Sequence, residues 1–396
     1  MTIMIRIYKK DRLMNVIQFI GGVVICVQVA VTICAILLFT GCSASDEAQG
    51  TPAATGSALV FSVTEGEGTT RGAATRAPQA TMTLDGTAGT VSLKDKGFGV
   101  FACHTGAHPY VSTTTTANLM YNQLVSYDDG EGVWQYAPLV YWPHGTTGDK
   151  DYVSFFAYAP HSTQAADCIV DMSRDDETGD PWLLYQLGGN ELPDGPAGWK
   201  ACQVDLLYDF QRDQQKNDNP STRVGLNFKH ALAAIGDRIT VTCDESVATR
   251  LKGVYEDSPV VLTVTQITLD YLLTRKGRLV LNGTTQPNWQ AVDSEDAKVH
   301  RTLTFTPNLA MVQATSASDS SITPFDSGAG HGIFYIPIES GSAKQQVTIT
   351  AQYTISTGVP AEVVEEGSVN AVVDLSFISN ASEGRNMDIT LRIPNN

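Results

Sequence analysis

One pattern governs most of this chain: short runs of β-forming residues alternate with clusters of turn residues, from about residue 97 to the last strand. No segment keeps a helical period of apolar residues beyond about 12 positions. Strands that follow one another through turns, with no helices between them, usually pair antiparallel and pack as sandwiches. The pattern therefore predicts an all-β protein made of antiparallel β-sandwiches.

The predicted strands share β-branched and aromatic residues bounded by Gly, Pro, Asn, Asp or Ser. They are Phe98–Ala102, Val133–Tyr136, Tyr152–Tyr158, Leu206–Tyr208, Val224–Phe228, Ile239–Cys243, Val260–Leu269, Arg278–Leu281, Leu303–Phe305, Ile333–Ile338, Gln346–Ile355, Ala371–Ile378 and Met387–Ile393. The apolar run of Tyr152–Tyr158 indicates burial on both faces. The short run His230–Ile235 is instead compatible with one helical turn.

A polar segment, Gln211–Thr222, contains no apolar residue and separates two groups of predicted strands. A chain of 396 residues has room for two or three domains. The segment is therefore the candidate connection between two domains, although a long exposed loop would have the same composition.

The first 41 residues differ from the rest. A basic start that contains Arg6 and Arg12 precedes an apolar stretch from Val16 to Thr40, which ends at Gly41-Cys42 before a polar segment. Small residues just before a cysteine resemble the lipobox of a bacterial lipoprotein signal, so residues 1–41 are the expected signal peptide and Cys42 the expected lipidated residue. The alternative is an ordinary membrane anchor with Cys42 incidental. The long apolar stretch also allows a later start methionine.

Two features lie close together downstream of Cys42. Leu59-Val60-Phe61-Ser62-Val63 alternates apolar and smaller residues and predicts a short strand within a polar stretch. Arg71 and Arg76 follow it, within a run of Thr, Gly and Ala. Two arginines among small residues predict an exposed segment that a protease can cut.

The charge of the chain excludes one class of partner, and its cysteines are compatible with two states. The net charge is −16, and removal of residues 1–76 would leave 20 basic and 37 acidic residues. Such a surface repels phosphate backbones, so nucleic acid is not an expected partner. Outside the signal and Cys42, the cysteines are Cys103, Cys168, Cys202 and Cys243. Disulfides and buried thiols are both compatible with their spacing.

Motifs that carry catalysis or cofactors are missing from the sequence. It has no nucleophile elbow, no zinc-protease helix motif, no Cys-x-x-Cys and no phosphate loop. Cys103, His104 and His108 lack a fourth ligand for zinc, and the acidic turns Asp128–Glu131 and Asp175–Glu177 are typical of solvated loops rather than calcium sites. We therefore expect no cofactor, no metal and no enzymatic activity.

Four of the five tryptophans fall between Trp134 and Trp199. Exposed, they would form a platform on which sugar rings stack; in sandwich domains such residues more often fill the core. We expect the core position.

Several motifs, in their order along the chain, resemble the fimbrillin-like proteins of Bacteroidales, the type V pilins. The resemblance is close from the signal to about residue 240. Beyond that residue, only the general character of two motifs matches. Its motifs are the lipobox, Thr69–Pro78, Gly97–Ala102, Asn118–Gln123, Trp134–Pro138, Tyr141–Pro143, Tyr152–Pro160 and Leu226–Leu232, with Phe334–Pro337 and Gly384–Ile393 near the end.

The resemblance implies a fold and a maturation route. The fold is two transthyretin-like sandwich domains in tandem, here 77–222 and 223–396. The chain would be carried to the outer membrane as a lipoprotein, held to lipid through Cys42, and cut after Arg71 or Arg76 by a trypsin-like protease. Residues 42–76 would then leave with the strand Leu59–Val63, and the protein would act in the fimbrium at the cell surface.

The resemblance also implies the partners, which are other pilus subunits. A sheet that loses a strand exposes unpaired backbone groups, and a strand from a neighbouring subunit can replace the lost one. The candidate donor is the last strand, with Ile389, Leu391 and Ile393; if that strand instead closes its own domain, the protein would be a tip or accessory subunit. A host protein or glycan is a further ligand to consider. The competing hypothesis is a monomeric surface lipoprotein, or a tip adhesin, that binds glycans through exposed aromatic residues.

Overall fold

The protein is described from a computed structural model. It covers residues 57–63, 81–82, 91–144, 150–162, 168–187, 205–218, 223–243, 260–284, 286–292, 298–305, 309–312, 321–322, 333–338, 345–357, 360–375 and 386–393. The expected signal peptide, Cys42, Arg71, Arg76, Trp199 and Cys202 lie outside these residues. Within the described ranges, no helix has the length and hydropathy needed to cross a membrane.

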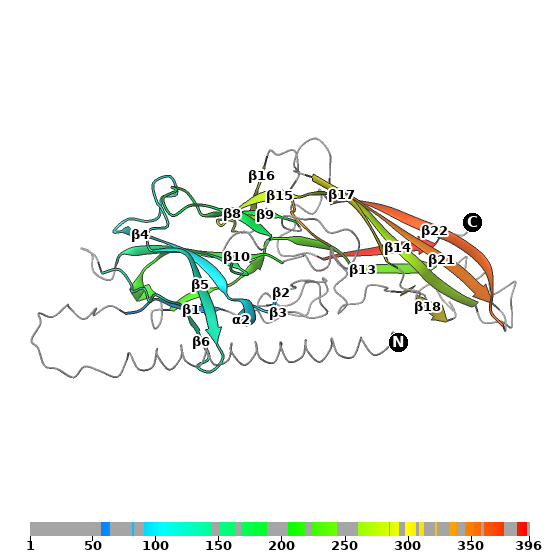
Figure 1. Cartoon of the computed structure of the whole chain (residues 1–396), viewed down its shortest axis with the longest axis horizontal. Coiled ribbons are helices and arrows are strands. Elements are labelled where there is room, and N and C mark those ends of the chain that lie inside the picture. Colours follow the sequence, from blue (N-terminus) through cyan, green and yellow to red (C-terminus); the bar gives the residue numbers. More distant parts are fainter. Residues whose placement is uncertain are drawn as a thin grey trace, which may run out of the picture. The chain divides into compact units, whose positions relative to one another are not determined.

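The described chain is built almost entirely of strands (Figure 1). They are β1 (Val60–Val63), β2 (Thr81–Met82), β3 (Val91–Ser92), β4 (Phe98–Gly106), β5 (Met120–Asp128), β6 (Val133–Gln135), β7 (Tyr152–Ala159), β8 (Ile169–Met172), β9 (Trp182–Gln186), β10 (Leu207–Gln214), β11 (Arg223–Leu226), β12 (Lys229–His230), β13 (Ala233–Cys243), β14 (Val260–Thr274), β15 (Lys276–Val280), β16 (Asn288–Ala291), β17 (Lys298–Phe305), β18 (Leu309–Val312), β19 (Ser321–Ile322), β20 (Ile333–Tyr335), β21 (Gln346–Thr357), β22 (Glu362–Asp374) and β23 (Asn386–Ile393).

Among the described residues, helical structure is limited to one turn, α2 (Leu93–Lys96), and a 3-10 turn, η1 (Lys216–Asp218). The all-β class is therefore confirmed. The tandem transthyretin-like arrangement and the boundaries at residues 41, 76 and 222 remain predictions.

The centre of the largest described sheet is β7. Six strands pair in the order β12-β10-β7-β4-β5-β6. Val153–Ala159 of β7 is buried throughout, which confirms the expected burial on both faces. Side chains alternate along a strand, so the two faces of β7 contribute to two separate cores. Phe156 and Tyr158 belong to one core, whereas Phe155 and Ala157 belong to the other.

The polar segment 211–222 does not begin as a loop. Strand β10 continues to Gln214, and it pairs Gln211 with Phe155 and Gln214 with Val153 of β7. Between these pairs, Asp213 takes a left-handed backbone conformation with φ of 54°, and its N–H donates to the Ser154 hydroxyl at 2.9 Å. The neighbouring strand supplies hydrogen-bond partners, and this outweighs the low β propensity of the segment.

The helical turn considered for His230–Ile235 does not form. The segment contains the end of β12 and the start of β13. Ala231 donates its N–H to the Leu206 carbonyl at 2.7 Å, and Ala233–Ile235 pairs with β20. Pairing with distant strands therefore satisfies the backbone that a helical turn would have satisfied locally.

Beyond residue 222 the described strands form two further groups. β17, β14, β21 and β22 lie in that order in one sheet (Figure 1), with β18 also paired to β14. Along β21, buried side chains alternate with exposed or half-buried ones, as expected for a sheet with one covered face. The other group surrounds β13, which pairs with β19, β20 and β23.

A four-stranded sheet combines strands from both sides of residue 222. Its order is β16-β15-β9-β8, so β15 pairs with β9, which precedes it by about 90 residues. The two chain halves are therefore joined by backbone hydrogen bonds as well as by the chain itself.

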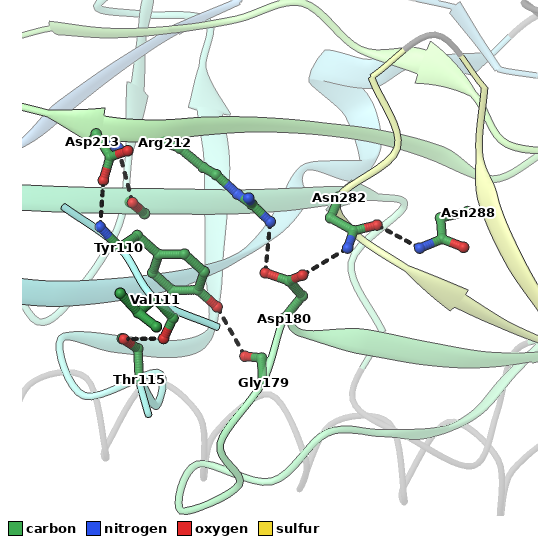
Figure 2. A network of polar contacts seen from close by, with 10 residues as sticks. Tyr110, Val111, Thr115, Gly179, Asp180, Arg212, Asp213, Asn282 and Asn288 are labelled. Carbon is green, nitrogen blue, oxygen red and sulfur yellow. Dashed lines mark hydrogen bonds and ion pairs between the residues drawn. The ribbon is translucent and has the colours of Figure 1, made fainter. Parts of the chain in front are cut away.

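A polar network reinforces this junction (Figure 2). Asp180, just before β9, accepts hydrogen bonds from Arg212 at 2.7 Å and from the Asn282 amide at 2.6 Å. Asn282 in turn accepts one from the Asn288 amide at 2.7 Å. The Arg212 guanidinium also lies 5.2 Å from the centre of the Tyr110 ring. Charge-assisted hydrogen bonds of this kind are stronger than neutral ones.

Replacing Asp180 tests the network. We expect Asp180→Asn to lower the free energy of unfolding by about 1–3 kcal/mol, because Arg212 loses its carboxylate partner in a site where Asp180 is only 11% exposed. Urea denaturation measures the change. The matched control is Asp176→Asn, whose ion pair with Arg174 is 77% exposed on the acid side and should change stability by less than about 0.5 kcal/mol. Equal effects of the two substitutions would contradict this interpretation.

Candidate functional site

Strand β1 pairs with the chain in an unusual way. It runs parallel to β11, with Val60, Phe61, Ser62 and Val63 opposite Arg223, Val224, Gly225 and Leu226. Among the described ladders, the only other parallel one joins β23 to β13. Antiparallel neighbours can be joined by a tight turn, whereas parallel ones cannot. The first and last described strands are thus added to edges that no hairpin connects to them.

Strand β1 packs against a cluster of aromatic residues. Leu59 is 1% exposed and Phe61 2% exposed, so both are fully in the core. The Phe61 ring lies 5.9 Å from that of Phe98 and 5.8 Å from those of Tyr136 and Phe155. Such tilted and edge-on pairs add to the free energy of burial. Phe61 is therefore the principal anchor of β1.

The start of β1 is held on its other edge as well. Leu59 donates its N–H to the Val140 carbonyl at 2.9 Å, and Trp142 donates to Ser57 at 2.9 Å. The Tyr136 hydroxyl donates to the Leu59 carbonyl at 2.9 Å. Burial raises the pKa of Tyr136 to about 12, so this hydroxyl remains a donor even above the pH at which an exposed tyrosine ionises. These contacts position Leu59 and leave the rest of the strand to β11.

A hollow of about 220 Å³ lies beside the remainder of β1. The residues that line it come from β1, α2, the β5–β6 hairpin and β11: Val60, Phe61, Ser62, Val63, Leu93, Lys94, Tyr127, Gly132, Val133, Trp134 and Arg223. The Lys94 ammonium lies 4.5 Å from the centre of the Tyr127 ring. This lining includes two cations and no carboxylate, within an acidic protein. It is suited to an extended apolar segment that carries a negative charge.

The candidate donor strand lies within its own chain in this structure. Ile389, Leu391 and Ile393 are opposite Ile239, Val241 and Cys243 of β13. The Leu391 side chain is 1% exposed and belongs to a different core from that of Phe61. Its role as a donor remains a prediction.

The residues considered for metal binding have structural partners. His104 lies 2.9 Å from the Asp151 carboxylate, and Asp128 accepts N–H bonds from Gly130 and Glu131 within the β5–β6 turn. No group of three or more His, Cys, Asp and Glu side chains suited to a metal is found in the described ranges.

The structure describes some of the cysteine and tryptophan side chains. Cys103 and Cys168 are buried, and burial raises the pKa of Cys103 to about 12. Trp142 is 3% and Trp289 9% exposed, as expected for core residues, and Trp134 and Trp182 are half-buried.

Three residues of the site have no sequence signal for the contacts they make. Tyr136 falls in a predicted strand and in the family motif Trp134–Pro138, whereas Lys94 and Arg223 fall in no predicted feature. Their importance comes from contacts across the fold, which residue spacing along the chain does not report.

Truncation of the anchor tests how β1 is held. We expect Phe61→Ala to destabilise the uncut chain by about 3–5 kcal/mol, because it leaves a cavity between three aromatic rings. Urea denaturation gives this value, and limited proteolysis should show faster cutting near residues 57–63. Ser62→Ala, on the same strand but only half-buried, is the control and should stay within about 0.5 kcal/mol. A Phe61→Ala protein as stable as the control would contradict the role of this side chain.

Comparison with known proteins identifies the family. The profile described as fimbrillin-like matches residues 75–372. Among solved structures, a fimbrial protein from Bacteroides vulgatus has the same fold, with a TM-score of 0.53 and 18% identity over 85% of this chain and 95% of that one.

Two other similar structures come from candidate cell adhesion proteins. The one from Parabacteroides distasonis has a TM-score of 0.40 and 10% identity, and covers 85% of this chain and 89% of its own. The one from Bacteroides eggerthii has a TM-score of 0.38 and 12% identity, with 85% and 87% covered. No protein with a curated function matches the sequence. The family profile spans most of the described strands, and the chain belongs to the fimbrillin-like family.

Proposed function

We propose that this protein is a structural subunit of a cell-surface pilus that contributes to adhesion, and that it polymerises by strand exchange. The observation that carries the proposal is β1, a terminal parallel strand whose aromatic anchor fills a groove, close upstream of Arg71 and Arg76. Family membership supports the same role. The proposed role is structural and involves no catalysis.

Maturation would proceed in three steps. Residues 1–41 direct export, and acylated Cys42 holds the precursor to outer-membrane lipid. A trypsin-like protease at the cell surface then cuts after Arg71 or Arg76. Residues 42–76 leave with β1, and the subunit from residue 77 onwards joins the fimbrium. The arginines lie outside the described residues, so the support for this route is the sequence around them and the family.

The energetics of β1 favour its loss after cleavage. Full burial of a leucine and a phenylalanine contributes about 3–6 kcal/mol in total. While β1 belongs to the chain, this suffices to hold it in place. Once it is a separate peptide, the same free energy corresponds to a dissociation constant between about 10 mM and about 10 μM. A cut after Arg71 or Arg76 therefore converts a stable strand into a weakly bound one.

The vacated groove would need a new strand. Loss of β1 exposes Phe98 and Phe155 together with the backbone edge of β11, and an unpaired edge beside apolar surface readily takes up another strand. β23 of a second copy fits this need in two respects. Its Ile389 and Leu391 are separated by one residue, as Phe61 and Val63 are in β1, and it already pairs in parallel. Repetition of the step builds a filament.

A tip subunit or monomeric adhesin is the second candidate. The observation in its favour is that β23 completes a sheet of its own chain here. A glycan or host protein would then bind through exposed aromatic residues such as Tyr121 and Tyr141, each 39% exposed. The burial of Trp142 and Trp289 reduces the aromatic surface that a sugar ring could stack on.

Cleavage is the first step to test. We expect trypsin to cut the chain from residue 43 onwards rapidly after Arg71 or Arg76, and to leave a resistant core of about 320 residues that forms oligomers or filaments. Mass spectrometry identifies the cut and electron microscopy the assembly. The chain with Arg71→Gln and Arg76→Gln is the control and should remain uncut there and unassembled. Cutting at many sites, or a core that stays monomeric with its first strand bound, would contradict the stalk role and favour the tip adhesin.

A further inference from the structure

The two strands that receive parallel partners, β11 and β13, have similar edges. β11 reads Arg223, Val224, Gly225 and Leu226, and β13 reads Arg238, Ile239, Thr240 and Val241 over its paired segment. Each places an arginine first, then an apolar residue, a small residue and a second apolar residue. A strand that fits one edge therefore meets the same order of side-chain types on the other.

The strands that pair with these edges also correspond, apart from one position. Val60, Phe61, Ser62 and Val63 lie along β11; Asp388, Ile389, Thr390 and Leu391 lie along β13 in the same order. The last three positions match in type: apolar, hydroxyl and apolar. At the first position, β1 places a valine opposite Arg223, whereas β23 places an aspartate opposite Arg238. Oppositely charged residues across a ladder attract, and a valine contributes no such attraction.

The surroundings of Val60 are prepared for a negative charge. Val60, Arg223 and Lys94 all line the hollow beside β1, whose lining contains no carboxylate. Arg223 is exposed, and within the described part of the chain no ion pair to it is found. A carboxylate at the position of Val60 would therefore lie opposite Arg223.

Charge also selects among the registers that the apolar pattern allows. A shift of one residue would turn every side chain to the opposite face, so only even shifts keep the apolar residues in the core. A shift that places Thr390 opposite Arg223 brings Arg392 opposite Gly225, beside both cations of the hollow. The opposite shift places Met387 and Ile389 opposite Val224 and Leu226, and it sets Asp388 opposite Gly225 instead of an arginine. The register with Asp388 opposite Arg223 places Ile389 and Leu391 at the two apolar positions and sets the aspartate opposite an arginine, as Asp388 is opposite Arg238 in its own chain.

We infer that Asp388 of one copy pairs with Arg223 of the next and sets the register of the exchanged strand, an inference that rests on the proposed function. The partner is a second copy of this chain, and its residues Asp388–Leu391 take the places of Val60–Val63. Asp388 thereby exchanges its own-chain neighbour Arg238 for Arg223.

Charge exchange tests the pairing in the trypsin-cut protein. We expect Arg223→Glu to slow assembly at least about tenfold, because it sets two carboxylates opposite each other. The same substitution together with Asp388→Arg should restore assembly, since the pair is reformed with opposite signs. Arg174→Glu makes the same change of charge on a side chain that is 75% exposed, and it should assemble at the unaltered rate. Light scattering follows the rates.

Cysteine cross-linking reads the register directly, even if a charge variant folds poorly. The pair Arg223→Cys with Asp388→Cys should form a disulfide between copies in the assembled state, whereas Arg223→Cys with Thr390→Cys should not. If the unaltered cut protein does not assemble, both the proposed function and this inference are wrong. If it assembles but Arg223→Glu has no effect, or the second cysteine pair cross-links, or neither does, the register is wrong while strand exchange as such stands.

Discussion

The packing of Phe61 against Phe98, Tyr136 and Phe155 is the contact on which the amino-terminal core depends. It brings together a residue from the first described strand and residues from strands that follow it by up to about 90 positions. Without that side chain, the surrounding rings would line an open groove. The chain therefore completes this core with a segment that lies upstream of a predicted cleavage site, which links the stability of the precursor to its processing.

The rest of the fold surrounds this contact with two separate cores. β7 is buried on both faces and separates the core of Phe61 from a second core that continues into strands beyond residue 222. The sheet shared by β9 and β15, and the Asp180 network beside it, fasten the two halves together. None of the residues of β1 belongs to the second core. Under the proposed function, the second core would therefore keep its own side chains when β1 leaves.

Much of the fold was predictable because period-two alternation and turn residues are local signals. The predictions for β4, β7 and β21 are confirmed within a few residues, and the strand character of Leu59–Val63 was legible from its alternation. The errors have a common cause. Gln211–Gln214 and His230–Ile235 gave weak or misleading local signals, and distant strands supplied the hydrogen bonds that made them β. Parallel pairing, the Tyr136 contact and the cations of the hollow are likewise properties of three-dimensional contacts.

Under the proposed function, the groove that β1 fills in the uncut chain is filled by another copy in the assembled state. The most direct measurement is peptide mass spectrometry of purified, trypsin-cut assemblies, with the peptide that contains Leu59–Val63 counted against a peptide from β7. We expect the β1 peptide to be absent from the assembly and recovered in the unbound fraction. A β1 peptide retained in equal amount with the β7 peptide would show that the subunits associate without exchanging this strand, and would contradict strand exchange.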